Sequence, residues 1–246
     1  MTTRKPSAHA IARALPRIAF LLAGVGLGVT APHALAADAS HPVVVELFQS
    51  QGCSSCPPAN ANVNAISQRA DVLALSFSVT YWDSLGWKDT FAKGQFTDRQ
   101  YAYARAMGEG NVYTPQVVIN GRLAGVGAER GEIEALMRKG DRAAPGPAIA
   151  IADGSAEIGA AAAPAEAADV WLVRYDPRTL DVPVLRGENA GKTLPHRNIV
   201  RELVRLGGWS GQAERFALPV SSDANLSAAI LVQGAGAGPI LAAAKG

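Results

Sequence analysis

The chain has 246 residues, including 23 lysines and arginines, 21 aspartates and glutamates, and a formal net charge of +2. This balance gives no indication of nucleic-acid binding. The two cysteines, Cys53 and Cys56, are too few and too close together for a framework of structural disulfides, because a bond over such a short step closes almost no loop.

Residues 1–36 are typical of an export signal. A basic start precedes an apolar run over 18–29, and the small-residue pattern at 34–36 predicts cleavage after Ala36. The alternative is an uncleaved membrane anchor, but the run is shorter than the roughly 20 residues that a spanning helix needs. Cleavage removes four basic residues and no acidic one, which changes the formal charge from +2 to −2. We expect a periplasmic or secreted protein with no membrane span after cleavage.

The first part after the signal reads strand, turn, helix, strand. Residues 43–48 form a nearly continuous apolar run, as expected for a buried strand. The prolines at 57–58 fit the first turn of a helix that continues to about Arg69, because their missing N–H groups would be unpaired there in any case. Residues 72–79 give the second strand, and a polar and aromatic insertion follows over 81–89.

A second unit then reads helix, strand, strand, helix. We expect Thr97 to cap a helix that ends near Met107. The strand 116–119 leads into Asn120-Gly121, a strong hairpin signal, and a returning strand over 123–126. A last helix spans 132–139 and is ended by Gly140. This order predicts an α/β thioredoxin-like domain over residues 37–140.

A proline- and glycine-containing linker at 141–147 separates this domain from a region of different texture, 148–246. Short strands with turn residues between them predict a smaller, mainly antiparallel and sandwich-like β domain. Residues 199–206 fit helical and strand spacing about equally, and we favour a strand. The other expected strands are 148–151, 156–158, 169–175, 215–220 and 228–233.

The Cys53-x-x-Cys56 pair lies between a strand and a helix, so the two sulfurs can form a disulfide at a helix N-terminus that favours a thiolate. Thr114-Pro115 precedes a strand, and we expect a cis bond there that faces the cysteines and docks an extended partner. Cys53 is the expected nucleophile, and Cys56 is expected to resolve the mixed disulfide. Trp82 either lines the substrate groove or packs the insertion onto the sheet.

Further polar residues are weaker candidates. Glu46 and Asp83 are possible proton relays for Cys56, although a strand carboxylate such as Glu46 is more often paired with a base or facing water. His196, Arg197 and Arg201 could bind an anionic group, and a solvated strand face explains them equally well.

Several segments together resemble an uncharacterised family of secreted bacterial thioredoxin-like proteins. The segments are 46–58, 81–87, 113–116, 186–189 and 196–201. The resemblance covers nearly all of the chain after the signal, and it implies a thioredoxin-like fold and an envelope location but says little about the reaction. The chain is more distantly similar to thioredoxins, whose Trp-Cys-Gly-Pro-Cys motif it lacks.

The leading hypothesis is an exported thiol–disulfide oxidoreductase that acts through Cys53 and Cys56 on protein or small-molecule thiols and disulfides of the cell envelope. We expect no cofactor and no metal. One alternative is a non-catalytic binding protein with a structural Cys53–Cys56 disulfide. The other is a metal-handling envelope protein, which is less favoured because metal sites usually need more soft ligands.

Overall fold

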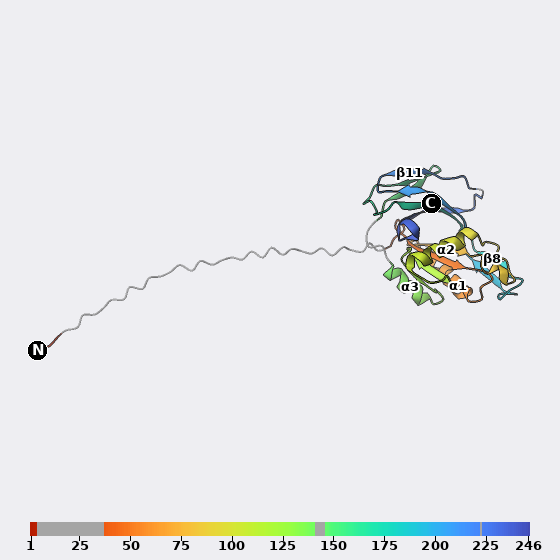
Figure 1. Cartoon of the computed structure of the whole chain (residues 1–246), viewed down its shortest axis with the longest axis horizontal. Helices are drawn as coiled ribbons and strands as arrows, with labels where there is room; N and C mark the ends of the chain where they lie inside the picture. Colours follow the sequence, from red (N-terminus) through yellow and green to blue (C-terminus); the bar gives the residue numbers. More distant parts are fainter. Residues whose placement is uncertain (4–36, 141–145, 222) are drawn as a thin grey trace. The chain divides into compact units, whose positions relative to one another are not determined.

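The computed structural model describes residues 1–3, 37–140, 146–221 and 223–246. Most of the predicted export signal and most of the predicted linker therefore lie outside the described residues. The described residues from Ala37 to Gly246 belong to one compact unit. This unit is a mixed α/β structure with one large mixed sheet and two small antiparallel sheets (Figure 1). In the described part of the chain, no helix is long and apolar enough to cross a membrane.

The first unit is a parallel β-α-β arrangement, as predicted. β1 (Val43–Gln49) and β2 (Val72–Ser78) pair in parallel along their whole length, and α1 (Cys56–Ile66) connects them. Every residue of both strands is buried, which explains their nearly continuous apolar sequence.

The insertion and the next helix follow, with one correction to the sequence analysis. A 3-10 turn, η1 (Asp83–Leu85), precedes α2 (Gly94–Met107). Thr97 does not cap this helix, because α2 begins three residues earlier and the Thr97 hydroxyl instead accepts a hydrogen bond from the Thr80 N–H at 2.9 Å. Packing determines the earlier start, since Phe96 is fully buried, with its ring centroid 5.3 Å from that of Phe77.

The remaining elements of the predicted first domain are confirmed. β3 (Gln116–Ile119) lies antiparallel to β1, and β4 (Leu123–Gly125) returns beside it. The turn between them uses left-handed backbone at Asn120 and Gly121, with φ values of 48° and 62°. α3 (Arg130–Lys139) follows and ends at Gly140.

Four strands of the predicted β-rich region extend the sheet of the first unit instead of forming a sheet of their own. Parallel pairing of Ile199 with Ser76 joins β10 to β2, and the Ser76 N–H donates to the Asn198 carbonyl at 2.9 Å. The large sheet therefore has the order β13-β12-β7-β10-β2-β1-β3-β4. β2 would be an exposed edge without β10, and its burial on both faces favours covering that edge. The strands added are β7 (Ala168–Asp176), β10 (Ile199–Trp209), β12 (Ser227–Gln233) and β13 (Ile240–Lys245).

The two small sheets lie in different places. β5 (Ile149–Ala152), β6 (Ser155–Ile158) and β11 (Glu214–Ala217) form a three-stranded sheet whose apolar side packs with β7, β10 and β12 in one core, so sandwich-like packing is present. Figure 1 shows β11 at one end of the compact unit and α1 and α3 toward the other.

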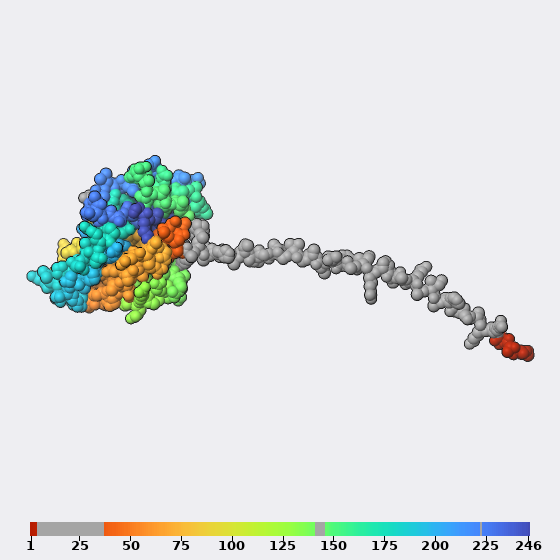
Figure 2. All heavy atoms as spheres, turned by 180° about the vertical axis from the view of Figure 1, so that it is seen from behind, coloured from red at the N-terminus to blue at the C-terminus, as the bar shows by residue number. Residues whose placement is uncertain are grey.

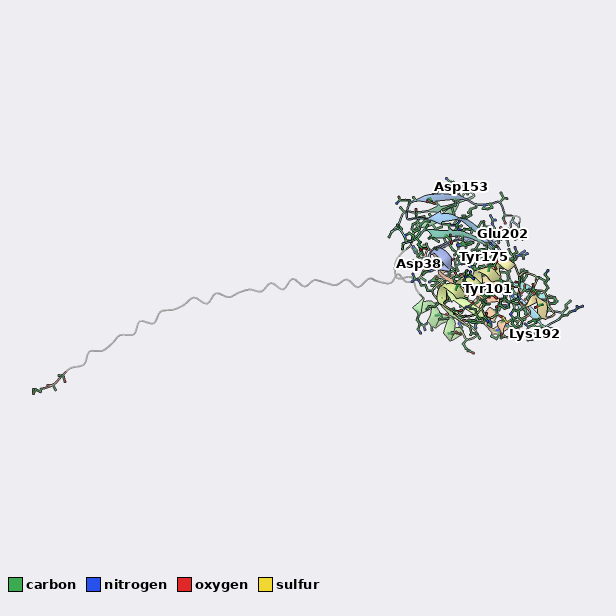
Figure 3. The ribbon with its side chains drawn as sticks, viewed as in Figure 1. Asp38, Tyr101, Asp153, Tyr175, Lys192 and Glu202 are labelled. Atoms are coloured by element: carbon green, nitrogen blue, oxygen red, sulfur yellow. A yellow bond between two sulfur atoms is a disulfide. The ribbon has the colours of Figure 1, made fainter. Side chains whose placement is uncertain are left out.

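The second small sheet is a hairpin that borders α1. It pairs β8 (Leu180–Pro183) with β9 (Thr193–His196), and β9 contacts α1. The surface view shows the cyan hairpin region against the orange surface of the first β-α unit (Figure 2), and Lys192 lies at the periphery of the unit (Figure 3). The sequence analysis missed β8, β9 and β13.

The two faces of the sheet carry different helices. Val44 and Phe48 of β1 belong to the core that includes residues of α2, whereas Val45 and Leu47 belong to the core that includes residues of α1 and α3. Because side chains alternate along a strand, Glu46 points to the α2 side of the sheet.

Candidate functional site

Cys53 and Cys56 form a disulfide at the start of α1, just after β1, with their Cα atoms 5.4 Å apart. Cys53 is 0 % exposed and Cys56 is 1 % exposed, whereas the intervening Ser54 and Ser55 are exposed. The disulfide is therefore present as predicted, and its sulfurs are covered in this oxidised state.

The first turn of α1 offers an unusually small set of hydrogen-bond donors. Pro57 and Pro58 have no N–H, and the Cys56 N–H donates to the Cys53 carbonyl at 3.2 Å. The N-cap residue Ser55 makes no side-chain capping bond. A thiolate at Cys53 therefore depends more on side-chain donors than on the helix backbone.

Thr114 provides such a donor. The Thr114–Pro115 bond is cis, and the Thr114 hydroxyl donates to Cys53 Sγ at 3.4 Å. The indole N–H of Trp82 donates to the same hydroxyl oxygen at 2.8 Å, which leaves the Thr114 proton directed toward sulfur. The structure thus brings Cys53, Thr114 and Trp82 together, and the substrate-binding role of Thr114, Pro115 and Trp82 stays a prediction.

The loop before the cysteines is fixed by the insertion. The Gln51 N–H donates to the Asp89 carboxylate at 2.7 Å, and the Trp87 indole N–H donates to Gln51 Oε1 at 2.9 Å. Burial raises the pKa of Asp89. Asp83 accepts a hydrogen bond from the Asp89 N–H at 3.1 Å, so Asp83 shapes this loop, and its relay role stays a prediction.

Glu46 is a paired strand carboxylate, the alternative that the sequence analysis favoured. Its oxygens accept hydrogen bonds from Arg99 at 2.7 and 3.2 Å and from the Tyr103 hydroxyl, all within the protein interior. Glu46 lies on the face of the sheet opposite to α1, because it alternates with Val45 and Leu47. This position separates its carboxylate from the helix that carries Cys56.

His196 is a buried neutral residue beside α1. Its Nδ1 lies 3.4 Å from Asn60 Nδ2, which also donates to the Pro195 carbonyl at 2.7 Å. Burial lowers the pKa of His196 to about 4. A neutral ring adds no charge to an anion site, although His196 and Arg201 both contact the Phe91 ring, at 6.1 Å between ring centroids and 5.2 Å from the guanidinium. His196 and Arg201 therefore share a neighbour, but only Arg201 contributes a positive charge there.

Two residues that contact the cysteine motif were missed as site residues. The Glu188 carboxylate accepts hydrogen bonds from Ser54 N–H at 3.1 Å and Ser54 Oγ at 2.6 Å. The Asn189 amide donates to the carbonyls of Gln51 at 3.0 Å and Cys53 at 2.8 Å. The segment 186–189 was noted in the sequence for its resemblance, but no spacing pattern places it beside Cys53, because the two are more than a hundred residues apart.

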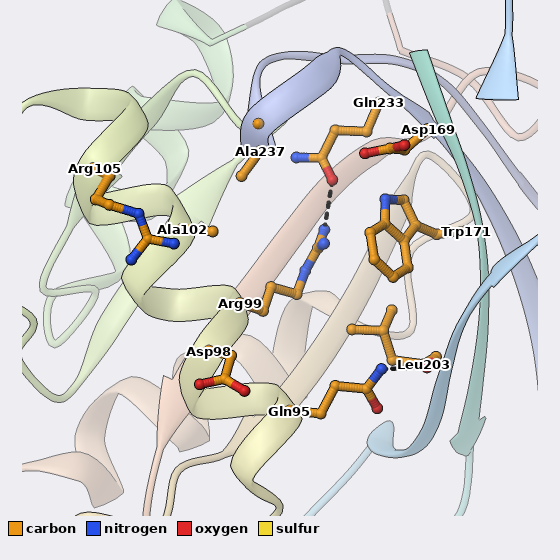
Figure 4. A pocket seen from close by; sticks show the side chains of 11 residues that line it. Gln95, Asp98, Arg99, Ala102, Arg105, Asp169, Trp171, Leu203, Gln233 and Ala237 are labelled. Atoms are coloured by element: carbon orange, nitrogen blue, oxygen red, sulfur yellow. Dashed lines mark hydrogen bonds between the residues drawn. The ribbon is translucent and has the colours of Figure 1, made fainter. Parts of the chain in front are cut away.

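A cavity of about 360 Å³ lies away from the cysteine motif (Figure 4). Residues of α2, β7 and β10 line it, including Gln95, Arg99, Trp171 and Leu203. Arg99 is already bound to Glu46 and Gln233, so its charge is compensated. Neither cysteine lines the cavity. Within the described ranges no group of three or more His, Cys, Asp or Glu side chains could hold a metal ion.

These features define a mixed α/β protein with a CxxC disulfide at the start of a helix, an arrangement that suggests a thioredoxin-like protein. The chain belongs to a family described as a protein of unknown function (DUF1223), whose model matches residues 44–233.

Two solved structures are similar to this chain. Protein AGR_C_4864 from Agrobacterium tumefaciens is 34% identical, with a TM-score of 0.67, over 82% of this chain and 92% of that protein. HBP35 of Porphyromonas gingivalis is 14% identical, with a TM-score of 0.58, over 84% of this chain and 75% of the other, which is a likeness of fold alone. No curated protein matches the chain.

Proposed function

We propose that the protein is an exported thiol–disulfide oxidoreductase built on a thioredoxin-like fold. One observation carries this proposal: the Thr114 hydroxyl, next to a cis proline, donates to Cys53 Sγ across about 60 residues of sequence. A permanent disulfide needs no such donor, whereas a thiolate formed by reduction is stabilised by it.

In the reducing direction, the Cys53 thiolate attacks one sulfur of a substrate disulfide. The Cys53–substrate disulfide forms as the substrate S–S bond breaks, and the other substrate sulfur leaves as a thiolate. Cys56, deprotonated, then attacks Cys53 Sγ, so the Cys53–Cys56 disulfide forms and the second substrate thiolate leaves. Two electrons pass from the protein to the substrate, and the oxidising direction is the reverse sequence.

The proposed partners are protein or small-molecule thiols and disulfides of the cell envelope, with the protein placed in the periplasm or secreted after cleavage behind Ala36. The basic and apolar pattern of residues 1–36 supports this location. The reaction requires no cofactor, because both electrons reside in the cysteine pair.

Trapping of mixed disulfides tests the proposal. The Cys56→Ala variant lacks the resolving thiol, so substrates should remain bound to Cys53 and be recovered from envelope extracts as covalent adducts. The Cys53→Ala variant is the matched control and should trap nothing. Absence of adducts with Cys56→Ala, in protein shown to be exported and folded, would contradict catalysis.

A second candidate is a binding protein with a structural disulfide, favoured by the burial of both cysteines. Equilibration with glutathione separates the two functions. A potential below about −300 mV indicates a structural bond, whereas about −120 mV indicates an oxidant and about −270 mV a reductant.

A further inference from the structure

We propose that Glu188 and Asn189 are positioning residues in a latch that covers Cys53 and favours its oxidised state, so that thiol exchange requires this latch to open. The latch is the segment of residues 184–192, which connects β8 to β9. This inference rests on the proposed function, since it concerns the regulation of the same cysteine pair.

The latch binds both polar groups of the peptide unit between Cys53 and Ser54, namely the Cys53 carbonyl and the Ser54 N–H. Asn189 donates to the Cys53 carbonyl at 2.8 Å and to the Gln51 carbonyl at 3.0 Å, and Glu188 accepts from the N–H and hydroxyl of Ser54. Asn189 is fully buried. Lys192 Nζ donates to Asn189 Oδ1 at 2.9 Å, which orients the amide so that its NH₂ group points to both carbonyls.

The latch has an internal structure of its own. Val184 N–H donates to the Lys192 carbonyl at 2.9 Å, and Gly191 N–H donates to the Val184 carbonyl at 2.8 Å. Gly187 has a left-handed backbone with φ 76°, and a Cβ there would lie 3.3 Å from Trp87 Cβ. The segment is therefore a loop held by its own hydrogen bonds, and it packs against the insertion.

Burial of the cysteines makes opening necessary. A thiolate must approach a disulfide sulfur directly, and Cys53 has no exposed surface while the latch, Thr114 and Trp82 surround the motif. Thr114 contacts the Cys53 sulfur itself, whereas the latch binds the backbone of Gln51 and Cys53 and the backbone and hydroxyl of Ser54 through two side chains of one loop. Loss of those bonds should release the cover without disturbing the disulfide geometry.

The charge on Glu188 also favours the oxidised state of Cys53. Its carboxylate binds the N–H and the hydroxyl of Ser54, the residue that directly follows Cys53 and precedes the N-cap of α1. The hydrogen bonds from Ser54 lower the pKa of Glu188, so this carboxylate is charged at neutral pH. A negative charge bound to the residue after Cys53 disfavours a second negative charge at Cys53, and this favours the disulfide over the reduced form.

The test measures how fast dithiothreitol reduces the disulfide of the purified mature protein, from which the export signal has been removed. Asn189→Ala removes the two bonds to the motif carbonyls, and we expect reduction about tenfold faster or more. Glu188→Gln retains the size and an acceptor oxygen but loses the charge. In a Cys56→Ala background, Glu188→Gln should lower the pKa of Cys53, which is measured from the thiolate absorbance as a function of pH.

Asp181→Asn is the matched control. Asp181 is an exposed acid on β8 of the same hairpin, so this substitution removes the same charge at a place away from the motif. It should leave both the reduction rate and the pKa of Cys53 unchanged. The latch would be overturned if Asn189→Ala were reduced at the wild-type rate. It would also be overturned if the pKa of Cys53 were the same in the Glu188→Gln variant as in the Asp181→Asn control. If Asn189→Ala does not fold, the exposed Glu188→Gln variant alone decides the question.

These measurements use a small reagent and need no physiological substrate. Failure to trap envelope substrates with Cys56→Ala would overturn the proposed function and leave the latch intact. Unchanged reduction kinetics in the latch variants would overturn the latch while the trapping result stands.

Discussion

Replacing Thr114 by valine removes the hydroxyl that donates to Cys53 Sγ and keeps the branched shape of the side chain. A hydrogen bond to a charged group contributes about 1.5–3 kcal/mol, and we use the lower end because the contact is long, at 3.4 Å. A loss of about 1.5 kcal/mol corresponds to a rise of about one unit in the pKa of Cys53, since one unit equals about 1.4 kcal/mol.

The kinetic effect should be smaller than the change in the pKa of Cys53. At a pH below this pKa, a rise of about one unit lowers the thiolate fraction about tenfold, but each thiolate is then about threefold more nucleophilic. The rate at which Cys53 attacks a model disulfide should therefore fall about threefold.

The assay titrates thiolate absorbance in a Cys56→Ala background and compares Thr114→Val with Thr114→Ser, which keeps the hydroxyl. We expect the serine variant to resemble the wild type. An equal pKa of Cys53 in the valine variant and the wild type would refute the role of this hydroxyl. Trp82→Phe removes the N–H that orients the hydroxyl and should give a shift in the same direction.

Three further predictions concern stability, and a fourth concerns the rate of reduction. His196 has a pKa of about 4 in the folded chain and about 6.5 in the unfolded chain, so the unfolded state binds the proton first as the pH falls. The free energy of unfolding should therefore drop by about 3 kcal/mol between pH 6.5 and 4. Urea titrations should show this slope for the wild type and lose it for His196→Gln, and a slope that persists in the variant would contradict the reasoning. Arg99→Met leaves Glu46 buried without its partner and should cost about 3–5 kcal/mol in chemical unfolding, whereas Glu46→Leu combined with Arg99→Met should recover part of this loss. Dithiothreitol should reduce Glu46→Gln at the wild-type rate, and a changed rate would support the relay role instead. Gly121→Ala should lower the melting temperature, because φ is 62° and the new Cβ would lie 2.6 Å from the Gly238 carbonyl oxygen; an unchanged melting temperature would contradict this close approach.

Local patterns account for the parts of the fold that could be predicted. The apolar runs of β1 and β2, the prolines after Cys56 and the Asn120-Gly121 turn each act over a few residues, and all of them appear where expected. The start of α2 differs because burial of Phe96 outweighs the capping preference of Thr97.

Long-range pairing explains what the sequence did not predict. β13 reads Ile-Leu-Ala-Ala-Ala-Lys, and alanine gives no strand signal, so only its pairing with β12 makes it a strand. The linker at 141–147 has the composition of a domain boundary, yet the strands after it continue the same sheet through β10. Periodicity does not reveal which strand will cover the edge of β2.

The site divides in the same way. The cysteine pair and Thr114-Pro115 carry recognisable motifs, and the structure brings them together. Glu188 and Asn189 have no local signature, because their contacts to the motif cross 134 to 138 positions of the chain. An exposed acid and an amide in a turn look like ordinary loop residues in the sequence.

The pairing of β10 with β2 also bears on when the cysteine pair becomes covered as the chain folds. The cysteines are made first, and the hairpin that carries Asn189 follows 136 residues after Cys53. Until that hairpin and β10 have been made and have joined the sheet, Cys53 and Cys56 have no cover from this part of the chain. The folding protein therefore passes through a stage in which this part of the chain does not yet cover the two thiols, and completion of the sheet ends that stage. The last third of the chain thus determines when the redox state of the first third becomes protected.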